Sequence, residues 1–356
     1  MRLPFISRWR CADAGVHSAV TMGQLSGVVP TAVVDRRARL ASASEYLACA
    51  FSPDHGFASW TSPFRDFSRR VRAPAECFTS AVIGQVLTDG GLEPPYLGEL
   101  LDVVRACINE EGFIHFFQDA SLLEADVDCT GVGHALLHEW GQGYPKLAET
   151  IGRLVNNTRS DGIIEVYANA GQEHEGRVDE CALANALYLL FVVGREGEAE
   201  PSYELVRKTL VEDSYLCGSR YYPCPDTFLY FVSRIVRDFP RTHAGLLEPL
   251  RRRLIDRFGA DTSCLDRAIR VAAADNVGML DIPDLEVVAH AQRPDGSWPA
   301  GPFYCFGATR RYLGSDALST AFAVRSLVVG GERGFGEMRE ALRGGVATRA
   351  VDLALE

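Results

Sequence analysis

The stretch DECALANALYLL, residues 179–190, opens on two carboxylates and continues as a helix that is apolar on nearly every side. A helix with this composition is buried all round. Comparable stretches start at intervals of 40 to 52 residues, each with an acidic residue at or near its beginning: Glu76, Asp128, Asp179, Asp226, Asp266 and Asp316. A regular period of this length indicates a repeat architecture.

The segments before these buried stretches have a different pattern. Residues 96–109, 146–156, 203–212 and 246–258 place charges on one side and Leu, Val or Ile on the other at helical spacing. Six buried helices inside six amphipathic ones predict an all-α fold, an (α/α)6 barrel in which six helical hairpins form a closed toroid. Alternating β-branched segments are scarce, which argues against a sheet core. We expect an N-terminal extension over residues 1–36 and a single barrel domain over residues 37–356.

Composition excludes some classes of function. The chain has 356 residues, and its formal net charge of -11 argues against nucleic acid as the main partner. It contains no run near the roughly 20 apolar residues that a membrane-spanning helix needs, and no stretch typical of a signal peptide. Ten cysteines without a CxxC pair fit buried thiols in a reducing compartment. We therefore expect a cytoplasmic protein.

The turn at residues 292–298, with sequence QRPDGSW, carries a second repeated feature. Asp-Gly favours a tight turn, and the aromatic ring that follows can pack against the next hairpin. The spacing of Gln292 and Trp298 resembles the QW motif of squalene cyclases and related proteins, in which these residues tie neighbouring hairpins together. We expect the same structural role here.

One of the six acidic helix starts has two closely spaced aspartates. The segment LEADVDCTG, residues 123–131, places Asp126 and Asp128 two residues apart at the entry of a buried helix. An acid at this place can simply cap the helix. Two neighbouring carboxylates in apolar surroundings also raise the pKa of one member, which can then act as a general acid at neutral pH.

The segment Asp126-Val127-Asp128-Cys129-Thr130 resembles the DxDD(T) motif of class II terpene cyclases, and its Asp-Cys-Thr part resembles the DCTA segment of oxidosqualene cyclases. The resemblance implies that Asp128 is the proton donor, that Asp126 matches the first motif aspartate, and that Cys129 tunes the acid. It implies a terpenoid cyclase-like fold and protonation-initiated cyclisation of a linear isoprenoid, either a prenyl diphosphate or a meroterpenoid chain. Protonation needs no cofactor, whereas a diphosphate substrate could require Mg2+.

The resemblance covers about residues 37–330, but the chain has room for one barrel where such cyclases usually pair two helical domains. The pocket then lies in the barrel mouth, or a homo-oligomer completes it. Residues that could line it beside the acid are mostly aromatic, although packing would explain many of them: Phe57, Trp60, Phe113, His115, Phe117, Cys181, Tyr222, Phe303 and Phe306. The nearby Arg65, Arg69, Arg70 and Arg72 could bind a diphosphate or form an exposed basic loop.

Two alternatives remain open. Asp179-Glu180-Cys181 resembles the zinc-binding Asp-x-Cys pair of protein prenyltransferase β subunits, which would indicate a prenyltransferase-like enzyme. The histidine expected near the last buried helix is missing, so we expect no metal site. A non-catalytic barrel that binds a lipid or a peptide is the other alternative. No DDxxD motif supports metal-triggered ionisation of a diphosphate.

Overall fold

A computed structural model describes residues 36–168, 174–240, 244–307, 309 and 311–332. The predicted N-terminal extension lies outside these residues except for Arg36, and so does the end of the predicted barrel domain. Among the described residues, no helix is long and apolar enough to cross a membrane.

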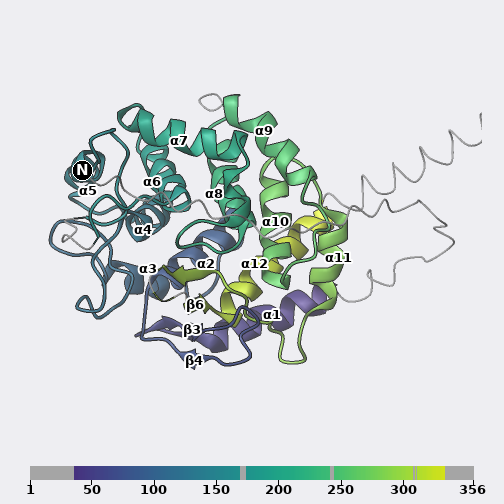
Figure 1. Ribbon diagram of the computed structural model, residues 1–356. Coiled ribbons are helices and arrows are strands. Elements are labelled where there is room, and N and C mark those ends of the chain that lie inside the picture. Colours follow the sequence, from purple (N-terminus) through teal and green to yellow (C-terminus); the bar gives the residue numbers. More distant parts are fainter. Residues whose placement is uncertain (1–35, 169–173, 241–243, 308, 310, 333–356) are drawn as a thin grey trace, which may run out of the picture.

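Alternate helices form an inner ring (Figure 1). The inner helices are α2 (Phe78–Asp89), α4 (Val127–Glu139), α6 (Glu180–Val192), α8 (Pro225–Asp238), α10 (Cys264–Asn276) and α12 (Asp316–Glu332). Each packs against the next, and α12 packs against α2. This closes the ring and confirms the predicted all-α barrel.

The remaining helices surround the ring. They are α1 (Arg36–Ala50), α3 (Leu97–Arg105), α5 (Leu147–Asn156), α7 (Glu200–Val211), α9 (Ala244–Ile255) and α11 (Ile282–His290), with 3-10 turns at Glu196–Ala199 and Ser214–Cys217. Helix α5 has the expected amphipathic burial, because Ile151 and Leu154 are buried whereas Glu149 is exposed. The inner helix α6 is instead buried along nearly its whole length.

Short strands cover the end of the barrel where the inner helices begin. Strands β1 (Phe51–Ser52) and β2 (Gly56–Phe57) form a small hairpin. Strands β3 (Trp60–Ser62), β4 (Val71–Arg72), β5 (Tyr304–Phe306) and β6 (Arg311–Gly314) form an antiparallel sheet in the order β4-β3-β6-β5. This sheet joins the first and last repeats, and its residues Tyr304 and Leu313 are buried in the core. We call this end of the barrel the acid rim, because it carries Asp128.

The turns also link neighbouring hairpins. Trp298 is fully buried, and its indole N–H donates to the Val288 carbonyl, while the Gln292 amide donates to the Arg39 carbonyl. Gly296 has φ +88, and a side chain there would meet the Ser42 backbone at 2.4 Å. The contacts of Gln292 and Gly296 connect the last repeat to α1, whereas that of Trp298 packs the turn against α11.

Candidate active site

Asp126 caps α4, so the neighbouring Asp128 is available for chemistry. The Asp126 Oδ1 accepts a hydrogen bond from the Cys129 backbone N–H, the interaction expected of an N-cap. Asp128 lies in the first turn of α4 and takes no part in this cap. The alternative that Asp128 itself caps the helix is therefore wrong.

Two side chains from other inner-helix repeats hold Asp128. Asn185 Nδ2, on α6, donates to Asp128 Oδ1 at 2.8 Å. The Tyr222 hydroxyl, just before α8, donates to Asp128 Oδ2. Asp128 is 5% exposed and Tyr222 is fully buried, so both oxygens of this carboxyl are fixed in a dry environment.

This environment favours the protonated acid. Burial and the negative charge of Asp126 raise the pKa of Asp128 to about 8, although the hydrogen bonds from Tyr222 and Asn185 act in the opposite direction. Burial raises the pKa of Asp126 to about 6, opposed by its hydrogen bonds to Cys129. Near neutral pH, Asp126 is thus the ionised member of the pair and Asp128 carries the proton.

An aromatic cluster adjoins the acid. The Tyr222 ring packs edge-on against Phe303 and Tyr304, with both centroids at 5.7 Å. Tyr304 then contacts Phe116 at 5.2 Å and Phe306 at 5.6 Å. The cluster is completed by Phe78, Phe117, Tyr221 and Phe231. Ring faces at this density can stabilise a positive charge through cation–π interactions.

The structure brings together only part of the predicted substrate-binding set. Tyr222, Phe303, Phe306 and Phe117 belong to the cluster. Cys181 is buried in the first turn of α6, where burial and then the Asp179 carboxylate raise the pKa of its thiol, with Asp128 making a smaller contribution. The other four predicted residues lie outside the cluster. Phe57 packs against Phe51 and Tyr96, and the Trp60 ring lies 4.6 Å from the Arg70 guanidinium. Phe113 is buried beside Asn109, and His115 Nδ1 lies 3.1 Å from the Leu123 carbonyl.

Sequence reasoning missed Asn185 and Tyr304. Asn185 is the single polar side chain in ALANALYLL, residues 182–190, apart from a tyrosine, and a buried amide in an apolar helix needs a partner. That signal could have identified it. Tyr304 lies between Phe303 and Phe306 in the sequence, but its place beside Tyr222 depends on the pairing of β5 with β6.

The zinc alternative fits the structure poorly. Asp179 Oδ1 accepts from the backbone N–H groups of Cys181 and Ala182, and its Oδ2 accepts from that of Tyr221. This carboxylate is therefore engaged as a helix cap and a link to the next repeat. Among the described residues, no group of three or more His, Cys, Asp or Glu could hold a metal ion.

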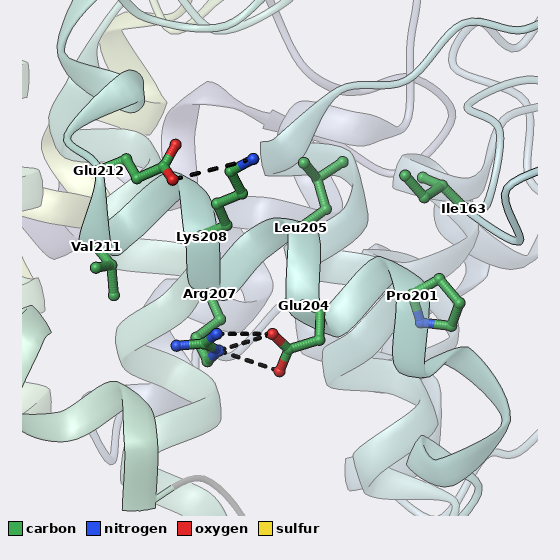
Figure 2. A pocket seen from close by; sticks show the side chains of 8 residues that line it. All are labelled: Ile163, Pro201, Glu204, Leu205, Arg207, Lys208, Val211 and Glu212. Atoms are coloured by element: carbon green, nitrogen blue, oxygen red, sulfur yellow. Dashed lines mark hydrogen bonds and ion pairs between the residues drawn. The ribbon is translucent and has the colours of Figure 1, made fainter.

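A pocket of about 440 Å³ also lies on the outer face of α7 (Figure 2). Glu204 pairs with Arg207 across it, and Lys208 Nζ lies 4.0 Å from Glu212. These are exposed pairs one helical turn apart, of the kind that contributes little energy. The pocket shares no residue with the Asp128 site.

Comparison with known proteins agrees with this geometry. No protein-family model matches the chain. Drimenol cyclase drtB from Aspergillus calidoustus is 31% identical over 183 residues, which make up 50% of this chain and 33% of that cyclase. This chain thus spans about a third of the length of the curated relative that it matches.

Solved structures share the fold across almost their whole length. The type II terpene cyclase MstE from Scytonema matches with a TM-score of 0.63 at 13% identity, covering 83% of this chain and 98% of that one. An MstE variant bound to its product, merosterolic acid A, gives 0.65 at 13% identity, covering 85% and 99%. A protein from Actinoplanes gives 0.62 at 15% identity, covering 83% and 98%. These matches confirm the terpenoid cyclase-like fold and the resemblance to class II terpene cyclases.

Proposed function

We propose that this chain, which has the fold of type II terpene cyclases, cyclises a linear isoprenoid by protonating it with Asp128. The observation that carries the proposal is a buried carboxyl whose pKa is raised to about 8 next to a cluster of aromatic rings. A general acid works best when its pKa is close to the operating pH. Asp128 meets this condition near neutral pH.

In the first step, Asp128 transfers its proton to a terminal alkene or epoxide of the substrate. The carboxylate left behind is stabilised by the two donors that already contact it, Asn185 Nδ2 and the Tyr222 hydroxyl. These donors need no rearrangement as charge develops, which is the arrangement expected of a preorganised site. Asp126 keeps α4 capped and supplies the negative charge that favours the protonated acid.

The positive charge produced on the substrate would move along the chain as rings form. Tyr222, Phe303, Tyr304 and Phe116 offer ring faces and edges in succession away from Asp128. Aromatic faces attract a cation without acting as bases strong enough to end the reaction early. Loss of a proton or attack by water would complete the reaction.

The substrate is proposed by class. One of the similar structures is an MstE variant in complex with geranylgeranyl dihydroxybenzoate, its substrate, and drtB is a drimenol cyclase. We therefore expect a prenyl diphosphate or a prenylated aromatic acid. Protonation itself requires no cofactor, and Mg2+ would matter only for a diphosphate head group.

Product analysis tests the proposal. The test compares wild type with Asp128→Asn and with a control, Asp102→Asn, which changes an exposed residue on α3. Each protein is incubated with geranyl, farnesyl and geranylgeranyl diphosphates and with geranylgeranyl dihydroxybenzoate, with and without Mg2+. Cyclised product from wild type and Asp102→Asn, but not from Asp128→Asn, supports the assignment. Equal product from Asp128→Asn would overturn it, and binding without product from wild type would favour a non-catalytic barrel.

A further inference from the structure

The loop between β3 and β4, residues 63–70, lies at the acid rim, and we refer to residues 63–72 as the rim loop. Its parent sheet also contains β5, which carries Tyr304 and Phe306 of the aromatic cluster. Arg65 Nη2 donates to the Pro223 carbonyl at 3.2 Å, one residue after Tyr222. The rim loop therefore borders the site on its outer side, at the lower edge of the view in Figure 1.

Two residues of the rim loop attach it to the rest of the barrel. Phe67 is 7% exposed and reaches Gly314 of β6, where an added side-chain atom would come within 2.9 Å of its ring. Arg70 pairs with Asp316 at 2.7 Å, at the start of α12. Phe67 is thus buried and Arg70 is paired, whereas Phe64 and Val71 are 46% and 56% exposed.

The charge of the rim loop is opposite to that of the chain. It contains four arginines and one aspartate, whereas the whole chain has a formal net charge of -11. Arg69 is exposed and lies 5.8 Å from the Phe64 ring, and Arg72 is exposed in β4. Arginines beside exposed apolar side chains match the chemistry of an anionic lipid surface, which attracts each basic residue and accepts apolar ones at its interface.

We propose that the rim loop docks the protein onto an anionic lipid surface, with Phe64 and Val71 inserted and Arg69 and Arg72 on the headgroups. The acid rim would then face the lipid layer. A hydrocarbon chain dissolved in that layer could reach the aromatic cluster without crossing much water. The docking does not depend on the cyclase activity, so each can fail independently.

Co-sedimentation of the full chain with vesicles tests the proposal. The vesicles are phosphatidylcholine alone, or phosphatidylcholine mixed with phosphatidylglycerol. Wild type should bind the mixed vesicles and release at high salt. Arg69→Gln/Arg72→Gln should bind about 25-fold more weakly, at about fivefold per arginine, and Phe64→Ser/Val71→Ser more than about tenfold more weakly.

Two controls match these variants. Arg252→Gln/Ile255→Ser removes one exposed arginine and an apolar residue that is 59% exposed on α9, and should bind as wild type does. Asp128→Asn should also bind normally, which separates docking from cyclisation. The proposal is overturned if wild type binds both vesicle types equally, or if the α9 control loses as much vesicle binding as the rim-loop variants. It is also overturned if inorganic pyrophosphate releases more protein than salt of the same ionic strength does.

Discussion

Replacing Asn185 with Leu removes one of the two hydrogen bonds to Asp128 while keeping a side chain of similar size. Asn185 Nδ2 donates to Asp128 Oδ1 at 2.8 Å in a buried site. A hydrogen bond to a charged group contributes about 1.5 to 3 kcal/mol, and one pKa unit corresponds to about 1.36 kcal/mol. Because the bond stabilises the ionised form, its loss should raise the pKa of Asp128 from about 8 by about one to two units.

The cyclisation rate measured against pH reports this change. The reaction needs protonated Asp128, so the rate falls as pH rises through its pKa, and in Asn185→Leu this fall should move to higher pH. A weaker acid is also a poorer proton donor, so kcat at neutral pH should drop. If the full value of about 3 kcal/mol for the hydrogen bond is lost in the transition state, kcat falls by about 150-fold, which is the upper limit. Asn156→Leu, on the exposed side of α5, should change neither quantity. A pH limb that stays in place or moves down, with the fold intact by thermal unfolding, would refute the reasoning.

Four further changes are predicted. Asp126→Asn keeps the cap but removes the charge that raises the pKa of Asp128, so the same pH limb should move down. Asp128→Asn should be more stable than wild type in urea unfolding at about pH 8. Because the pKa of Asp128 is raised in the folded state, the free energy of unfolding of wild type falls by about 1.4 kcal/mol for each unit that the pH rises between about pH 4 and pH 8. Equal stability of the two proteins at about pH 8 would contradict the raised pKa. Gly131→Ala would place a Cβ 2.7 Å from the Asn185 backbone, so kcat should fall with the Asp128 contact, whereas Gly152→Ala, with open space around it, should be neutral. Asp89→Asn should cost about 3 to 5 kcal/mol at pH 7, a loss that fades below about pH 4 as wild-type Asp89 protonates in the unfolded chain.

The ring of helices could be predicted because its signal is local and repeated. Stretches such as residues 182–190 are apolar on nearly every side, whereas segments such as residues 146–156 have one apolar and one charged face. Inner and outer helices therefore differ in composition. The four-stranded sheet was not predicted. Its strands have two to four residues, and β3 pairs with β6 across about 250 residues of sequence, which no local pattern reveals.

The acid could be identified from sequence because the two carboxylates of DVDCT are only two residues apart in the chain. Its contacts with Asn185 and Tyr222 could not be predicted, since these residues lie 57 and 94 positions away and reach Asp128 only when the ring closes. Gly131 follows the DVDCT segment and stands where the DCTA segment of oxidosqualene cyclases has alanine. In the structure it lets α4 approach the Asn185 backbone, so this glycine sets the distance on which the Asn185 hydrogen bond depends.

The two ends of the barrel treat buried carboxylates in opposite ways. At the end where the inner helices finish, Asp89 is contacted by Arg234 at 2.9 Å and Arg237 at 2.7 Å, with Arg325 at 3.6 Å. Burial alone would raise its pKa, but the three cations outweigh burial and hold that pKa below its usual range. These residues come from α2, α8 and α12 and tie the ring together from inside.

At the acid rim the same degree of burial has the opposite result. The hydrogen-bond partners of Asp128 are a neutral amide and a neutral phenol, and the charge that acts on it comes from another carboxylate. Burial is therefore not compensated by a cation, and the proton remains on Asp128 at neutral pH. The acidity of Asp128 therefore lowers the stability of the folded barrel, whereas the ion pairs of Asp89 at the other end contribute to it. Changes at Asp128 should alter both acidity and stability, whereas changes at Asp89, which is not among the groups that shift the pKa of Asp128, should alter stability alone.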